Sequence, residues 1–137
     1  MNNKPLVGTL IAAVLLLGTA CSHKVRMTPA TSVPAAMGVA KLKKDKNGNT
    51  IVDLQVQHLA RPDSLTPPQS VYIVWIQPRG GQVMKEGVLR VDDNLRGEFK
   101  TPAPSRNFDI FVTAENGPNV TQPAGPEVLR QTITQQS

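Results

Sequence analysis

Cys21 is the only cysteine among the 137 residues, and its surroundings determine what its thiol can do. A single thiol excludes a disulfide within the chain, and no cluster of cysteines and histidines has the spacing of a zinc site. A predominantly apolar run of twelve residues, 6–17, follows Lys4 and leads into the small residues at 18–20. Twelve residues are well short of the roughly 20 that span a bilayer, but they suit the apolar region of a secretory signal peptide. Cys21 therefore marks the end of an export signal.

A small-residue site placed directly before a lone cysteine resembles the lipobox of bacterial lipoproteins. Thr19 and Ala20 suit that motif, whereas Gly18 stands where leucine is usual. The resemblance implies cleavage before Cys21 and attachment of lipid to its sulfur and its new amino group, so that residues 1–20 are a lipoprotein signal peptide. The alternative is an ordinary secretory signal, cut after Ala20, which leaves Cys21 as a free thiol.

Residues suited to acid–base or nucleophilic catalysis are few after this leader. A nucleophile needs a base beside it, and the two histidines are His23, near the start of the mature chain, and His58, at the end of a predicted strand. Asp92 and Asp93 are adjacent in a predicted turn, where aspartate is favoured because it bonds nearby backbone N–H groups. Glu115 precedes a loop rich in glycine and proline, and we expect it to accept hydrogen bonds from the backbone of that loop. These residues predict neither an enzyme nor a cofactor.

Two patterns raise the question of a metal. The segment 45–49 resembles the start of a calcium loop, but the glycine and the bidentate glutamate that the loop requires are missing, which excludes it. His58 and Met84, with Trp75, could offer imidazole and thioether ligands to Cu(I). They occupy unrelated strand positions, so we assign no metal ligands. A periplasmic protein that binds copper or another ligand remains the alternative function.

The charge of the chain limits its partners. The formal net charge is +5 at pH 7, and Lys4 is lost with the leader. An exported protein meets no genomic DNA, and the chain has no basic stripe with interleaved aromatic residues, so nucleic acid is excluded as a partner. A charge of this size favours solubility and some attraction to anionic lipid headgroups. The predicted partner of the N-terminal end is the membrane, through its lipid.

Residues 21–35 contain two prolines and show no regular period, and we interpret them as a lipidated tether. Fully extended, the fourteen residues after Cys21 would hold a domain at most ~45–50 Å from the membrane. By resemblance to lipoprotein sorting, Ser22 permits transfer to the outer membrane, since aspartate there would signal retention in the inner membrane. The predicted location is the cell envelope, on the periplasmic face of the outer membrane.

The remaining residues, 36–137, predict one domain of short β-strands. The six apolar residues 71–76 are β-branched or aromatic and too few for a helix, so they indicate a central strand buried on both faces. Residues 38–59 alternate as a hairpin does, and Asn47-Gly48 favours a type I′ turn. Further strands are expected near residues 83–91, 99, 108–113 and 128–134. About seven strands without a helical period predict an all-β fold, a two-layer antiparallel immunoglobulin-like β-sandwich.

In such a sandwich, one face of the central strand meets the core. We assign Val71, Ile73 and Trp75 to that face, which turns the alternate residues outward beside the strand that carries Phe111. The resulting candidate interaction patch consists of Tyr72, Val74, Ile76 and Phe111. An apolar patch of this kind indicates either a covering segment or a partner. The cover would be the loop 116–126 or the tether, and the partner would be another envelope protein or a second copy of the chain.

Five short segments between residues 71 and 128 follow a recognisable order. They are Tyr72-Ile73-Val74-Trp75, Pro78-x-Gly80-Gly81, Lys85-Glu86-Gly87-Val88-Leu89, Val112-Thr113-Ala114-Glu115-Asn116-Gly117 and Pro123-Ala124-Gly125-Pro126-Glu127-Val128. Their order and spacing resemble the extracytoplasmic C-terminal domain of the anti-sigma-K factor family. In that family a cytoplasmic segment binds the sigma factor and a transmembrane helix joins it to the outer domain. Neither segment is expected in this chain, so the resemblance implies the outer domain alone, a non-enzymatic interaction or envelope-associated module.

Overall fold

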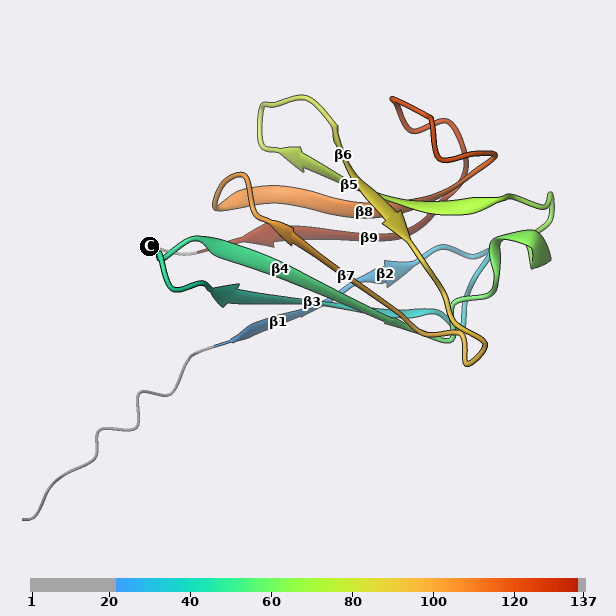
Figure 1. Cartoon of the computed structure of the whole chain (residues 1–137), viewed down its shortest axis with the longest axis horizontal. Helices are drawn as coiled ribbons and strands as arrows, with labels where there is room; N and C mark the ends of the chain where they lie inside the picture. Colours follow the sequence, from blue (N-terminus) through green and yellow to red (C-terminus); the bar gives the residue numbers. More distant parts are fainter. Residues whose placement is uncertain (1–21, 136–137) are drawn as a thin grey trace, which may run out of the picture.

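The computed structural model describes residues 22–135, in which nine β-strands form two antiparallel sheets facing each other (Figure 1). The first sheet has the strand order β1-β3-β4-β7, and the second has the order β2-β9-β8-β5-β6. The strands are β1 (His23–Arg26), β2 (Thr28–Pro29), β3 (Met37–Lys44), β4 (Thr50–Gln57), β5 (Val71–Pro78), β6 (Met84–Leu89), β7 (Gly97–Pro102), β8 (Asn107–Glu115) and β9 (Glu127–Thr134). A 3-10 turn, η1 (Pro62–Ser64), lies on the connection from β4 to β5. The predicted all-β sandwich is confirmed.

The predicted central strand lies inside the second sheet, between β8 and β6. β5 pairs with β8 along its whole length, from Val71 opposite Glu115 to Pro78 opposite Phe108. The chain forms hairpins at β3–β4, β5–β6 and β8–β9, and it crosses between the sheets after β1, β2, β4, β6 and β7. Crossings of this kind are typical of immunoglobulin-like sandwiches. The expected neighbour of the central strand, the one carrying Phe111, is therefore also confirmed.

The segment interpreted as a tether is part of the sandwich, so that prediction is wrong for the described residues 22–35. β1 pairs with β3 in the first sheet, and β2 pairs with β9 in the second. Between them Met27 is buried and donates its N–H to Gly38 O at 2.8 Å, and Ala30 N–H donates to Val128 O at 2.9 Å. Val33 is buried in the same core. The folded domain therefore begins at His23 rather than at residue 36, which accounts for two strands beyond the seven expected.

The β3–β4 hairpin is present, but its turn differs from the predicted type. Gly48 has φ +82°, whereas Asn47 is not in the left-handed region, so a type I′ turn is excluded. Gly48 N–H donates to Asp45 O at 3.1 Å, and the Asp45 carboxylate accepts the N–H groups of Asn47 and Asn49 at 2.8 Å. Hydrogen bonds from Asn49 are the main cause that lowers the pKa of Asp45. The aspartate therefore organises a turn and does not begin a calcium loop.

The main core lies between the sheets, and it reverses the assignment of the two faces of β5. Tyr72, Val74 and Ile76 are fully buried there and pack with side chains of both sheets. The Tyr72 hydroxyl donates to Ala60 O at 2.6 Å, and burial raises the pKa of Tyr72 to about 12. Ile73 and Trp75 belong to a second apolar cluster on the outer face of the second sheet. Three of the four residues of the candidate interaction patch are therefore core residues.

Candidate functional site

The outer face of the second sheet is apolar, as predicted, but it is covered. Phe111 is the one patch residue that faces this side, and it is 3 % exposed beside Ile73 and Trp75. Val120 of the loop 116–126 packs against this cluster. The Arg130 guanidinium lies 4.2 Å from the centre of the Phe111 ring, which is cation–π geometry. The structure therefore places a covering segment of the chain on this face, and the candidate patch offers no open surface for a partner.

A buried hydrogen-bond chain fixes that cover. Trp75 Nε1 donates to Thr113 Oγ1 at 2.7 Å, and the Thr113 hydroxyl donates to Glu115 Oε1 at 2.6 Å. Glu115 is 1 % exposed and accepts the backbone N–H groups of Ala124 at 3.1 Å and Gly125 at 2.8 Å. The predicted role of Glu115, accepting hydrogen bonds from its own loop, is confirmed.

The loop can approach the sheet this closely because residue 125 is glycine. A Cβ at Gly125 would lie 1.7 Å from Ala114 O, far inside van der Waals contact. A second support is Arg130, which bonds Glu127 and Asp109 at 2.8 Å. The hydrogen bond that Arg130 donates to Glu127 is the main cause that raises the pKa of Arg130. The guanidinium is thereby held over the Phe111 ring.

These contacts show what three of the five ordered sequence segments do in this chain. Residues from three of them, the strand of Trp75, the Thr113–Glu115 pair and the Ala124–Gly125 turn, meet in one buried network. The bridging role of Thr113 was not predicted from the sequence. The signal was its spacing, because residues two apart on a strand share a face. Thr113 and Glu115 therefore lie on the same face of β8, where Thr113 links Glu115 to Trp75. In this chain, residues of these three segments therefore serve to pack the loop against the sheet.

The remaining candidate residues lie apart or have structural roles. Asp92 accepts the N–H groups of Asn94 and Arg96 at 2.9 Å, as expected of a turn aspartate. His58 is exposed after β4 in the first sheet, whereas Met84 begins β6 in the second sheet. Within residues 22–135, no three His, Cys, Asp or Glu side chains gather as a metal site would require.

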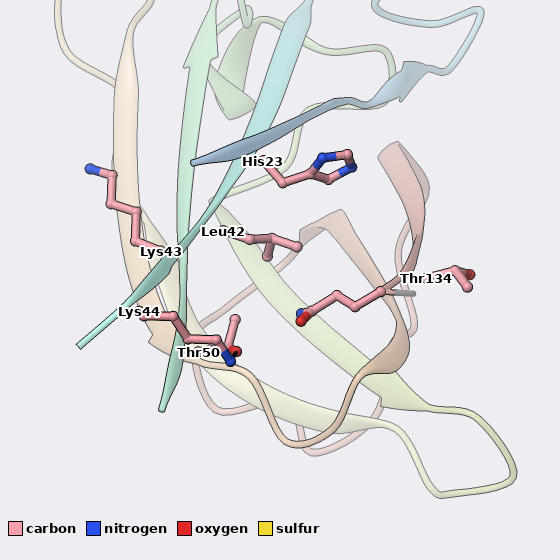
Figure 2. A pocket seen from close by; sticks show the side chains of 7 residues that line it. His23, Leu42, Lys43, Lys44, Thr50 and Thr134 are labelled. Atoms are coloured by element: carbon pink, nitrogen blue, oxygen red, sulfur yellow. Dashed lines mark hydrogen bonds between the residues drawn. The ribbon is translucent and has the colours of Figure 1, made fainter. Parts of the chain in front are cut away.

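A cleft of about 560 Å³ opens between the sheets, at the end where the described chain begins (Figure 2). Figure 2 shows His23 of β1 and Leu42 of β3 pointing into it, with Thr134 on its far side. Lys44 donates to Thr50 Oγ1 at 2.7 Å at its rim. The cleft is lined by His23, Leu42, Lys43, Lys44, Thr50, Thr134 and Gln135.

Of the two lysines that line this cleft, Lys43 directs its side chain to a different surface. In Figure 2 Lys43 points away from the cleft, and its Nζ lies 3.1 Å from Asp53 Oδ2 on the outer face of the first sheet. Lys41 and Lys100 are directly opposite Asp53 on the two neighbouring strands. The lysine-rich β3 is an interior strand of this sheet, because it lies between β1 and β4. Asp53 therefore offsets the lysine charge within this sheet.

Cys21, the predicted lipidation site, lies outside the described residues. Among residues 22–135, no helix has the length and apolar character needed to cross a membrane. Comparison with known proteins found no matching family model, no matching curated protein and no matching solved structure.

Proposed function

We propose that this chain is an envelope lipoprotein whose sandwich is a non-enzymatic interaction module held directly on the membrane by lipid on Cys21. The observation that carries the proposal is a sequence junction. A signal-like apolar run and small residues end at Cys21, and a folded strand, β1, begins two residues later. The location proposed for the anchored chain is the periplasmic face of the outer membrane, since Ser22 follows the cysteine.

The position of β1 changes what the anchor does. Two residues span at most ~7 Å, so a lipid on Cys21 would hold His23 and the start of the sandwich against the headgroups. A flexible tether would have let the domain reach partners tens of ångströms away. An anchor without a spacer instead fixes the height and restricts the tilt of the module, which suits a protein that meets neighbours in the same membrane.

The surfaces left to a partner are polar and charged. Among residues 22–135, the large apolar side chains that remain exposed are Met37 and Met84, which start different strands in different sheets. The proposed partner, another envelope protein or a second copy, would therefore meet hydrogen-bonding and charged groups. The resemblance to the outer domain of the anti-sigma-K family supports a module of this type. Residues of three of the five resembling segments serve packing in this chain.

The anchor is tested on the mature N-terminus. Mass spectrometry of the chain purified from the membrane fraction is expected to show Cys21 as the first residue, carrying diacylglycerol on sulfur and an acyl group on its amine. Two or more acyl chains give stable attachment where a single chain does not. Cys21→Ser should block processing, and Ser22→Ala, which keeps the thiol, should leave acylation intact. A mature chain with a free Cys21 thiol, or one cleaved elsewhere, contradicts the proposal.

A further inference from the structure

The end of the sandwich at which the described chain begins is assembled from five places in the chain. The start of β1 pairs with the end of β3, with His23 opposite Leu42. The start of β4 pairs with the end of β7, and the start of β8 pairs with the ends of β5 and β9. The turns after β3, β5 and β7 therefore gather at this end, together with the end of β9 (Figure 1).

These turns carry more cations than carboxylates. Lys44 and Lys46 flank the β3–β4 turn, Arg79 follows β5, and Arg106 precedes β8. All four residues are exposed. Within the described residues of these turns the carboxylate is Asp45, and it is engaged with the backbone of its own turn.

At the opposite end of the sandwich, arginines are balanced by aspartates. Its turns place Arg61, Arg90 and Arg96 among the carboxylates of Asp63, Asp92 and Asp93. Arg61 lies 3.7 Å from Asp63 and 3.6 Å from Asp93. The sandwich is therefore polarised along its strands, and its positive end is the end at which the described chain begins.

We infer that this positive end binds anionic phospholipid headgroups, so that lipid and charge together hold the module on the membrane. The inference rests on the proposed lipidation, which would hold His23, at this end of the sandwich, within ~7 Å of Cys21. That distance is shorter than the ~8 Å screening length of physiological salt. Each lysine or arginine so close to an anionic leaflet strengthens binding about fivefold. The cleft between the sheets opens at the same end, with His23 and Lys44 at its mouth, and can admit a headgroup phosphate.

The test uses the mature chain, which contains all nine strands described within residues 22–135, from His23 to Thr134. Its only thiol, at Cys21, is coupled to a maleimide bearing one myristoyl chain, because a single chain gives weak, reversible binding that leaves the charge contribution measurable. Partition is compared between vesicles of phosphatidylcholine and vesicles with about one-third phosphatidylglycerol. We expect a preference for the anionic vesicles on the order of a hundredfold at low salt.

Charge reversal locates the contact. Lys44→Glu with Lys46→Glu should abolish the preference, whereas Arg90→Glu with Arg96→Glu, an equal change in net charge at the far end, should keep it within about threefold. A second pair, Lys46→Glu with Arg79→Glu, leaves the Lys44–Thr50 hydrogen bond intact and should lose as much of the preference for anionic vesicles as the first pair. An equal loss in both pairs shows that misfolding of the first variant is not its cause. Equal losses at both ends, or no preference in the unmodified sequence, would overturn the inference. Because the acyl chain is attached chemically, this result is independent of whether the cell lipidates Cys21.

Discussion

Replacing Trp75 with alanine is expected to lower the free energy of unfolding by about 3–5 kcal/mol, as for other large buried side chains. The indole is fully buried on the covered face of the second sheet, between Ile73 and the Phe111 ring. Its removal leaves a cavity under the loop and takes away the donor to Thr113. Since a domain of this size has about 5–15 kcal/mol in total, the variant should be marginally stable or unfolded.

The measurement is urea unfolding followed by circular dichroism, because the substitution removes the chain's only tryptophan and its fluorescence. Trp75→Phe is the matched control, since it keeps an aromatic ring in the cluster and loses the N–H donor. We expect Trp75→Phe to lose less free energy of unfolding than Trp75→Ala. The difference between the two variants separates the contribution of packing from that of the hydrogen bond. A loss below about 1 kcal/mol for Trp75→Ala would place the side chain at the surface and contradict the covered face.

Replacing Glu115 with alanine is expected to release the loop 116–126 and cost about 2–4 kcal/mol, since hydrogen bonds to a charged group contribute about 1.5–3 kcal/mol each and part of that is offset by no longer burying a carboxylate. The substitution leaves the N–H groups of Ala124 and Gly125 without their acceptor. As the cover opens, Trp75 should meet water, and its fluorescence should shift to longer wavelength before global unfolding.

Glu127→Ala is the matched control for Glu115→Ala. Glu127 is exposed and pairs with Arg130 at the protein surface, where an ion pair contributes at most about 1 kcal/mol. We expect it to leave Trp75 emission and loop proteolysis unchanged. If both variants exposed Trp75 equally, the loop would be held by Arg130 and not by the buried glutamate.

Much of the second sheet could be predicted from the sequence. The residues at 71–76 have no polar member, which marked β5 as a strand covered on both sides, and the structure buries Tyr72 to Ile76 completely. Glu115 could also be predicted, because a carboxylate directly before a glycine- and proline-rich loop faces many backbone donors. In both cases the local sequence contained the cause of the structure.

The two faces of β5 could not be told apart for the same reason. Both are apolar, so no polar residue marks the solvent side, and the large indole of Trp75 suggested the main core. The cover that buries it comes from residue 120, forty-five positions away in the sequence. The sequence of a strand does not show whether a segment from elsewhere in the chain covers one of its faces.

The N-terminal strands had a signal that the prolines obscured. Residues 24–27 alternate lysine, valine, arginine and methionine, which is strand periodicity, and Val25 and Met27 turn inward. Pro29 argued against a strand, yet it lies at the end of the two-residue edge strand β2, where a missing N–H is tolerated. The two strands β1 and β2 are short and lie in different sheets, so the alternation is too brief to stand out in the sequence.

The central claim is that the folded module begins at His23, directly after the proposed lipid anchor. Amide hydrogen exchange of the mature chain tests it at Met27 and Ala30, whose N–H groups donate to Gly38 and Val128 across the two sheets. We predict slow exchange at both amides, approaching that of the β5 interior. Exchange of both at the rate of an unstructured chain would contradict the claim and restore a flexible tether.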